Sequence, residues 1–506
     1  MKKYLYVLLL LLGVSAGMVS CIHDDTTGFV KEISDITITK VSGEGVDEDG
    51  KFAVAELMMP VHFEAEAEQT LEGYELSYEW KAGFIKEYND GEPVMDSLFL
   101  ISDSKVVEYS FGRVGEFLVR LRVSNEFGST FHYMTVEIKA GMERGLMILS
   151  SDEAGKGSLA FCSVDREANE LLQAKAEDFE QDAWSRINPD YELMDARDMV
   201  IMDYGNSKNS VFVLSESQQT MYELEQNSLL VLRKIDLSII IKDIKPVAIV
   251  PCWQYMAVMT DAGQVVCSDL DNLGLINETW GTEMKGEKCY RGVYKDDWGG
   301  GNVSIPILAD NENEKLIGYV NPNNNITDSE SDFQGRRIVN FTLVGPTNNR
   351  NLLVVSKPKN NSDKAWVTTY KSITNFLDDR LAVFSKGDGY QEREYTLAAP
   401  LALDINSEMI YNGNYNVIFY NNGSTIYRWR YTSDFSQATR VALPAGEITC
   451  MAASPDGEYL YVGAYDAAAA GLKGSVYIYS TKDLQLVNSF VGVTDKPVKL
   501  FYKDKN

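Results

Sequence analysis

Histidine, the usual general base of enzymes and the commonest metal ligand, is almost absent from this sequence. Its 506 residues contain three histidines, His23, His62 and His132, so the long stretch after residue 132 has none. That stretch therefore lacks the base of a Ser/Cys triad and any histidine ligand for a metal. The chain has no HExxH, P-loop or dinucleotide-binding motif, and no GxSxG after residue 20. We expect no catalytic residue, no metal site and no cofactor.

Carboxylates are the one catalytic group in ample supply, because the chain has 74 aspartates and glutamates. Two carboxylates facing each other across a cleft can hydrolyse a glycosidic bond. Sequence spacing cannot locate such a pair when its members come from distant segments, and most acidic residues are solvated surface groups. A hydrolase therefore remains an alternative to a binding protein.

Three aromatic residues lie together in one glycine-rich segment, "CYRGVYKDDWGGGN", residues 289–302. They are Tyr290, Tyr294 and Trp298. Three consecutive glycines follow the tryptophan and disfavour regular structure, so the segment is expected to form a loop. Sugars and peptide side chains both stack on aromatic rings that loops expose. We expect these three residues to contact a ligand or partner, with simple packing inside the loop as the alternative.

The N-terminus has the layout of a bacterial export signal. Lys2 and Lys3 precede an apolar run, and small residues follow it. The sequence Met18-Val19-Ser20-Cys21 resembles a lipobox, in which the cysteine receives a lipid and the preceding residues are removed. We therefore predict a signal peptide over residues 1–20 and lipidation of Cys21, which would anchor the chain to a membrane.

The residues just after Cys21 indicate which membrane surface the protein occupies. His23-Asp24-Asp25 resembles the acidic lipoprotein export signal of Bacteroidota, which directs lipoproteins to the outer face of the outer membrane. Asp24 and Asp25 would be its essential residues, and a plain solvated linker is the alternative. Residues 21–30 are then a lipidated tether.

The charge and the cysteine content exclude several other roles. The formal net charge of −27 repels nucleic acid, so no nucleic-acid partner is expected. Besides Cys21 the chain has five cysteines with wide spacing and no CxxC pair, which is neither a disulfide framework nor a zinc site. Most of these are expected to be buried as small apolar residues, and one disulfide among Cys252, Cys267 and Cys289 is the alternative.

Residues 31–140 alternate apolar and polar residues over short runs, as strands with one wet face do. In "EFLVRLRVSNEFG", Phe117, Val119, Leu121 and Val123 share one face of the expected strand. Tyr78 and Trp80 supply bulky apolar groups on an earlier strand. The pattern predicts a small β-sandwich.

The same residues resemble a PKD domain. Such domains carry a tyrosine-x-tryptophan strand followed by a Y-x-F-x-x-x-G-x-Y-x-V-x-L-x-V-x-N-x-x-G pattern. This chain matches at Tyr78, Trp80, Tyr109, Gly115, Phe117, Val119, Leu121, Val123, Asn125 and Gly128. The usual DFGDG after the tryptophan is replaced by "KAGFIKEYNDGEP", which leaves any function of that loop in doubt. With the lipobox, the chain resembles PKD-like lipoproteins of Bacteroidota.

Residues 141–506 read as repeated four-stranded units. The clearest unit is near the end, where Asp456-Gly457 forms a hairpin signal between two apolar runs. Four strands within about 45 residues are typical of one propeller blade. We predict an all-β chain with a PKD/Ig-like β-sandwich followed by a β-propeller of seven blades, six or eight being possible. The final strand, 496–503, would complete the first blade; two further sandwiches are the rival interpretation.

The resemblance implies a function. PKD-like lipoproteins of this kind are associated with Sus-type nutrient uptake, in which a TonB-dependent transporter barrel works with a SusD-like lipoprotein. We therefore expect a non-enzymatic, surface-exposed accessory protein that binds an oligopeptide or a glycan. A hydrolase acting in the propeller funnel and a purely structural scaffold for other lipoproteins are the alternatives.

Overall fold

The computed structural model describes residues 32–504, except 166–167, 205–207, 240–244, 253–254, 270–285, 296–301, 320–325, 347–349, 361–362, 372, 376–379, 383, 385 and 387–388. The chain divides into two compact units, and the first of them ends at Ile138. Glu56–Met59 belong to the second unit, which resumes at Lys139 and continues to the C-terminus. The division falls two residues before the predicted boundary at 140.

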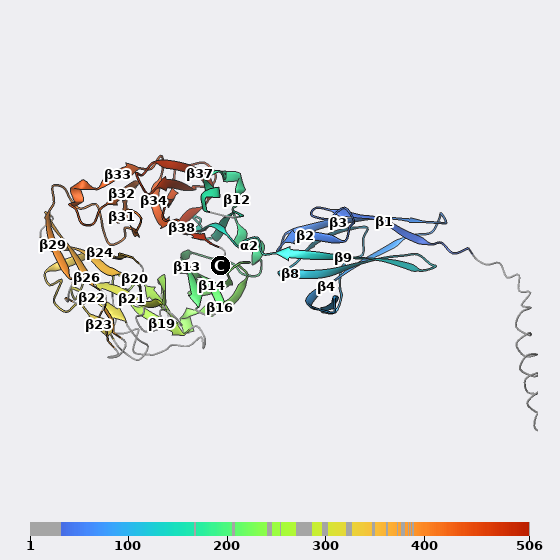
Figure 1. The fold of residues 1–506 in the computed structure, drawn as a ribbon, viewed down its shortest axis with the longest axis horizontal. Coiled ribbons are helices and arrows are strands. Elements are labelled where there is room, and N and C mark those ends of the chain that lie inside the picture. The colour runs from blue at the N-terminus through green and yellow to red at the C-terminus, as the bar shows by residue number, and fades with distance from the viewer. Residues whose placement is uncertain are drawn as a thin grey trace, which may run out of the picture. The chain divides into compact units, whose positions relative to one another are not determined.

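The first unit is a β-sandwich of two antiparallel sheets (Figure 1). One sheet has the strand order β1-β3-β7, and the other has the order β2-β9-β8-β4-β5 with β6 also paired to β4. The strands are β1 (Ile36–Gly43), β2 (Phe52–Glu56), β3 (Pro60–Gln69), β4 (Ser77–Asn89), β5 (Glu92–Met95), β6 (Phe99–Ser102), β7 (Val106–Ser110), β8 (Gly115–Ser124) and β9 (Ser129–Lys139).

The predicted alternation along β8 is confirmed. Phe117, Val119, Leu121 and Val123 are all buried, and the equally buried Trp80 of β4 pairs with Leu121 across the two strands. The Trp80 indole stacks on Phe63 of the other sheet at a centroid distance of 6.3 Å and donates its N–H to the Ser104 carbonyl. The polar atom of this large buried ring is therefore satisfied.

Two motif residues of the first unit have clear physical roles. Gly115 has φ +124°, and a Cβ there would lie 2.9 Å from the Phe84 ring, so no larger residue fits. Asn125 accepts hydrogen bonds from the Phe127 and Gly128 amides at 2.9 and 3.1 Å, and its Nδ2 donates to the Ser34 carbonyl at 3.0 Å. Asn125 therefore closes the turn between β8 and β9 and links this turn to the segment that precedes β1.

The second unit contains seven sheets among its described residues, besides a two-stranded hairpin of β27 (Ile373–Asn375) and β28 (Arg380–Ala382). In chain order the first four are β12-β11-β10-β38, β13-β14-β15-β16, β17-β18-β19 and β20-β21-β22-β23. Their strands are β10 (Gly145–Ser151), β11 (Gly157–Ser163), β12 (Phe179–Glu180), β13 (Ala196–Tyr204), β14 (Lys208–Ser215), β15 (Thr220–Glu225), β16 (Val231–Asp236), β17 (Pro246–Cys252), β18 (Tyr255–Thr260), β19 (Val265–Asp269), β20 (Lys288–Lys295), β21 (Asn302–Asp310), β22 (Lys315–Tyr319) and β23 (Ile326–Asp328).

The remaining sheets are β24-β25-β26-β29, β30-β31-β32-β33 and β34-β35-β36-β37. Their strands are β24 (Arg336–Val344), β25 (Asn351–Pro358), β26 (Lys364–Lys371), β29 (Gln391–Thr396), β30 (Met409–Asn412), β31 (Val417–Asn422), β32 (Thr425–Trp429), β33 (Thr439–Ala442), β34 (Glu447–Ala453), β35 (Tyr459–Tyr465), β36 (Gly474–Ser480) and β37 (Leu486–Thr494), with β38 at Lys496–Lys503. Helical turns of the described residues are confined to η1 (Ala168–Leu172), η2 (Ala176–Asp178), α2 (Ala183–Ile187), η3 (Leu237–Ile239) and η5 (Phe435–Gln437).

The innermost strands of these sheets form a closed ring. Strand β38 neighbours β13, and the series continues through β17, β20, β24, β30 and β34, which neighbours β38 again. Each sheet is thus one blade, and the second unit is a seven-bladed β-propeller (Figure 1). The prediction of a sandwich followed by a seven-bladed propeller is confirmed, and two further sandwiches are excluded.

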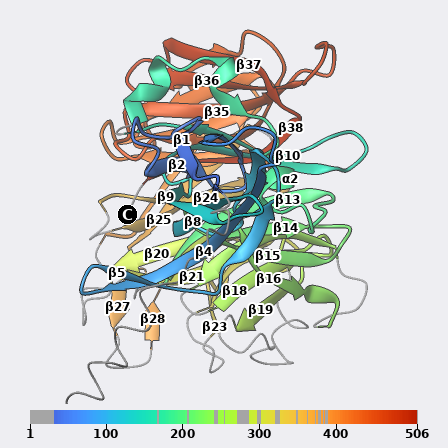
Figure 2. The same ribbon diagram turned by 90° about the vertical axis from the view of Figure 1, so that its right-hand side faces the viewer.

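The first blade is built from both ends of the second unit. Strand β38 pairs antiparallel with β10 over Lys496–Lys503, as predicted from the spare C-terminal strand, and Figure 2 shows the two side by side. Strand β38 therefore completes the first blade as its innermost strand and closes the ring, and β10 is paired on both sides.

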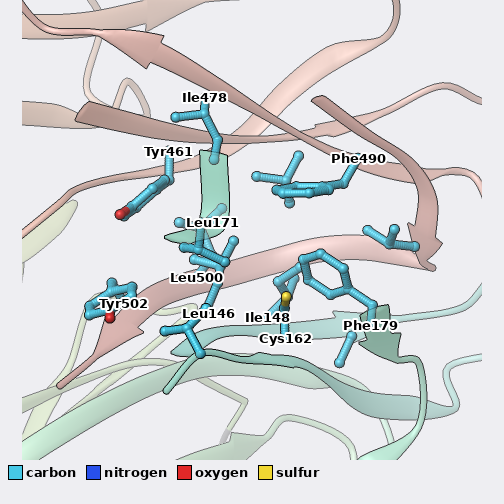
Figure 3. Close-up of a cluster of buried hydrophobic side chains, with 14 of the residues drawn as sticks. Leu146, Ile148, Cys162, Leu171, Phe179, Tyr461, Ile478, Phe490, Leu500 and Tyr502 are labelled. Atoms are coloured by element: carbon cyan, nitrogen blue, oxygen red, sulfur yellow. The ribbon is translucent and has the colours of Figure 1, made fainter. Parts of the chain in front are cut away.

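A cluster of buried side chains joins the first blade to the last blade (Figure 3). Leu146, Leu500 and Tyr502 of the first blade pack with Tyr461, Ile478 and Phe490 of the last blade. The cluster includes Cys162 and Cys450, whose thiols are free and buried; burial raises the pKa of each to about 12. These two cysteines are small apolar core residues, as expected.

Candidate functional site

The innermost strands share a local irregularity near their first residues. In five of the seven blades described, the strand carries one extra residue relative to its partner, a β-bulge. The extra residues are Arg197, Val247, Val339, Thr449 and Val498. A bulge locally resets which face each side chain takes, so it can turn a polar residue of a buried strand towards the axis of the ring.

A cavity of about 960 Å³ lies along this axis and is lined mainly by residues of the innermost strands and of the segment that leads into β30. Lining residues near the N-terminal ends of these strands, including Glu447 and Lys496, are charged. Lining residues nearer the C-terminal ends are mostly apolar, including Ile201 and Phe501. A cavity of this volume can hold a small ligand that is a few amino-acid or sugar residues long.

Four charged side chains from four different blades converge in this cavity: Asp198, Lys288, Glu408 and Lys499. The Lys499 ammonium lies 3.8 Å from a carboxylate oxygen of Asp198 and 3.8 Å from one of Glu408. Strands β38 and β13 are neighbours in the ring, whereas Glu408 precedes β30, so Lys499 reaches past the last blade. We call these four residues the channel charge cluster.

Asp198 is the most buried member of the channel charge cluster, with 8% of its surface exposed. Its two carboxylate oxygens accept hydrogen bonds from the amides of Met199 and of Ile249 in the next blade, both at 2.9 Å. Burial raises the pKa of Asp198, while Lys499 and the two amides act in the opposite direction. The bulge at Arg197 places this carboxylate on the seam between two blades.

Lys288 is held by neutral groups rather than by a carboxylate. Its ammonium donates to Asn340 Oδ1 at 3.0 Å and to the Ser407 carbonyl at 3.1 Å. Burial lowers the pKa of Lys288 to about 8, with the nearby Glu408 opposing and Lys499 reinforcing the effect. A lysine whose charge is expensive to keep, beside an open cavity, is suited to receive an anionic group.

The side chains of the residues predicted from sequence lie outside the described residues, so their contact with a ligand or partner stays a prediction. Tyr290 and Tyr294 belong to strand β20, where their backbones pair with Ile307 and Val303. The expected loop over 289–302 was therefore wrong up to residue 295, because pairing with β21 overrides the loop signal of the glycines. Trp298 lies outside the described residues, as do Cys21, Asp24 and Asp25.

The channel charge cluster was missed in the sequence, although a weak signal exists. A polar residue is followed directly by an apolar one early in the innermost strand at "RDMVI", "VNFTL" and "VKLFY", which contain Asp198, Asn340 and Lys499. In an isolated strand such a residue indicates only a solvent-exposed face. The three residues are seen to occupy equivalent positions, each directly after the bulge of an innermost strand, only when the blades are arranged in a ring.

Among the described residues, no group of three or more histidine, cysteine, aspartate or glutamate side chains is arranged to hold a metal ion. None of the helices described is long and apolar enough to cross a membrane.

The fold and the cavity define a class of protein: a PKD-like sandwich joined to a seven-bladed propeller with a charged central channel. The family model of the PKD domain matches residues 50–138, in agreement with the resemblance. No curated protein matches the sequence of the chain.

Solved structures resemble most of the chain at low sequence identity. A quinonprotein alcohol dehydrogenase-like protein from Bacteroides thetaiotaomicron is 13% identical, with a TM-score of 0.50 over 93% of this chain and 99% of that one. A functionally unknown protein from Desulfotomaculum acetoxidans is 10% identical, with a TM-score of 0.42 over 72% of this chain and 100% of that one. The first likeness is one of fold alone.

Proposed function

We propose that this chain is a non-enzymatic binding protein, anchored by lipid at Cys21 to the outer membrane and facing the cell exterior. It serves there as an accessory component of a SusCD-like nutrient uptake complex, and the bound nutrient is an oligopeptide or a glycan. The observation that carries the binding role is the open central cavity into which four blades send charged side chains.

The chemistry of the cavity supports binding over catalysis. The second unit contains no histidine, so histidine cannot transfer protons there at neutral pH. Asp198 is fixed by two backbone amides and Lys288 by an amide and a carbonyl oxygen. Groups held in this way can act as fixed charges and hydrogen-bonding partners for a bound ligand.

The membrane location and the partners rest on the sequence. The lipobox at residues 18–21, the acidic pair Asp24-Asp25 and the PKD domain together support a surface lipoprotein. The partners proposed are a TonB-dependent transporter barrel and a SusD-like lipoprotein. The sandwich, which follows the tether, would act as a spacer between the lipid and the propeller.

Affinity purification of the full chain from detergent-solubilised outer membranes tests this proposal. A TonB-dependent barrel and a SusD-like lipoprotein should co-purify, and the Cys21→Ala variant should lose both. A preparation that brings down neither partner would contradict the uptake role.

A separate incubation tests the absence of catalysis. Peptides and oligosaccharides should stay intact over long incubation with the purified protein. Turnover that disappears in Asp198→Asn or Glu408→Gln would establish the hydrolase alternative instead, with the channel carboxylates as its catalytic pair.

A further inference from the structure

The charges that line the channel balance, although the protein as a whole is strongly acidic. Four basic residues (Arg197, Lys288, Lys496 and Lys499) and four acidic residues (Asp198, Glu287, Glu408 and Glu447) line the cavity. The whole chain has a formal net charge of −27. A cavity that only continued the acidic surface would repel anions, whereas this one offers both signs to a ligand.

Two of the eight charges are engaged by partners that do not line the cavity. Arg197 lies 3.4 Å from Glu216, and Glu287 lies 2.8 Å from Arg337. A third, Lys496, lies over the Tyr465 ring at 5.7 Å. These contacts lie near the N-terminal ends of the innermost strands. Five charges remain: the exposed Glu447 and the four residues of the channel charge cluster.

The carboxylates of the channel charge cluster keep acceptor capacity for a ligand. Lys499 lies 3.8 Å from each of its two carboxylates, whereas hydrogen-bonded ion pairs are about 2.7–2.9 Å apart. Lys499 attracts both carboxylates at this distance without a close hydrogen bond to either, so oxygens of Asp198 and Glu408 can also accept from an ammonium group of a ligand.

Lys288 can bind the opposite, anionic end of a ligand. It uses two of the three N–H groups of an ammonium on Asn340 and Ser407, so one N–H can still donate. With Lys499 it supplies two cationic groups that can receive a carboxylate. The cluster thus offers a pair of anions and a pair of cations within one cavity.

Apolar side chains complete the walls of the cavity. Ile201, Met259, Ile405 and Phe501 line it together with the charged groups. A volume of about 960 Å³ exceeds the needs of one amino acid and accommodates a short peptide with apolar side chains. A neutral sugar brings hydroxyl groups but no charge of either sign to match the opposed charges of the cluster, whereas a peptide with free ends brings both.

We infer that the channel binds a short peptide as a zwitterion, with its ammonium end at Asp198 and Glu408 and its carboxylate end at Lys288 and Lys499. This inference rests on the proposed function, and within it selects the oligopeptide over the glycan. Because both ends are read by charge, the site should tolerate different side chains and discriminate against blocked peptides.

Calorimetric titration of the full chain, purified from membranes in detergent, tests the inference. The probes are the tripeptide Ala-Phe-Ala, its N-acetyl form, its C-terminal amide and the neutral sugar maltotriose. The free tripeptide should bind, each blocked form should bind at least tenfold more weakly, and maltotriose should not bind. Equal binding of free and blocked peptides, or no binding of the free peptide, would overturn the inference.

Variants locate the binding to the channel. Lys499→Met and Glu408→Gln should each weaken binding of the free tripeptide at least tenfold, and the double variant keeps the net charge unchanged. Lys364→Met and Glu394→Gln remove an ion pair at the outer part of another blade, between β26 and β29, and should bind as the parent does. Thermal unfolding of every variant shows that the fold is kept.

The outcome separates this inference from the proposed function. If no tripeptide binds but the transporter and the SusD-like lipoprotein still co-purify, the zwitterion site fails and the accessory role stands. If the tripeptide binds as expected but no transporter co-purifies, the site stands and the uptake role fails.

Discussion

Asp198 and Asn340 occupy the same position in two different blades of the propeller. Each follows a one-residue bulge in the innermost strand, and each accepts a hydrogen bond at its Oδ1 from the amide of the next residue. Each also uses its second side-chain atom to hold the start of the following blade. Asp198 accepts from the Ile249 amide there, whereas Asn340 donates to the carbonyls of Asp404 and Ser407.

Exchanging the two side-chain types should therefore destabilise the propeller at both positions. In Asp198→Asn one of the two amides loses its acceptor, which costs about 1–3 kcal/mol, partly offset by removing a buried charge. In Asn340→Asp an acceptor faces two carbonyl oxygens at 2.8 and 2.9 Å, and the ion pair gained with Lys288, 3.0 Å from Oδ1, should offset this repulsion only in part.

Chemical denaturation at several pH values checks this pair. The defect of Asn340→Asp should shrink on acidification, because a protonated carboxyl can donate to one of the two carbonyls. A variant that is as stable as the parent, or whose defect does not change with pH, would show that the side chain at 340 does not join the blades.

Loss of the Leu500 side chain should weaken closure of the ring. Leu500 lies on β38, is fully buried, and packs in the cluster between the first and last blades (Figure 3). Leu500→Ala should lower the free energy of unfolding by about 2–5 kcal/mol. The matched control is Leu486→Ala, where the side chain is 45% exposed and the change should stay within about 0.5 kcal/mol. Equal effects of the two changes would argue against closure by β38.

The charge of Lys288 should make stability depend on pH in a defined direction. Burial lowers the pKa of Lys288 from 10.5 to about 8, so below about pH 8 the lysine is charged in both the folded and the unfolded chain. The folded state then bears the whole cost of burying the charge, roughly 3 kcal/mol for a lowering of this size. As the pH rises towards the unfolded pKa, the folded state binds fewer protons and the cost disappears.

The variant Lys288→Met removes this contribution. Its stability relative to the parent should be highest near pH 7 and should fall as the pH rises towards 10, measured by denaturant unfolding. Lys364→Met, whose side chain is 42% exposed, should show no such trend. A Lys288→Met difference that stays constant across this range would contradict a buried ammonium.

Cys21 should decide whether the chain stays with membranes. Lipidation of this cysteine would bury enough methylene groups to hold the protein on a bilayer, so Cys21→Ala should move it to the soluble fraction. Replacing Asp24 and Asp25 by alanine should leave it anchored but protected from protease added to whole cells. Unchanged membrane partition of Cys21→Ala would refute lipid anchoring, and continued cleavage of the double variant would reduce the acidic pair to a linker.

The sequence was sufficient for the features that depend on near neighbours in the chain. The alternation at Phe117, Val119, Leu121 and Val123 predicts a half-buried strand because successive side chains of a strand point to opposite faces. Asp456-Gly457 predicts a tight turn, and Gly457 has φ +72° between β34 and β35. The order of such strands and turns was enough to predict a sandwich, seven blades and a closing C-terminal strand.

Only the tertiary structure decided the candidate site. Asp198, Lys288, Glu408 and Lys499 are about a hundred residues apart in sequence, and nothing near each one marks it as part of a group. They meet because seven innermost strands surround one axis and bulges reset the direction of individual side chains. For the same reason the local glycine signal misled at Tyr290 and Tyr294, where pairing with β21 produced a strand. Local pattern determines what each element is, but the position of its polar groups relative to one another is set by the packing of the whole ring.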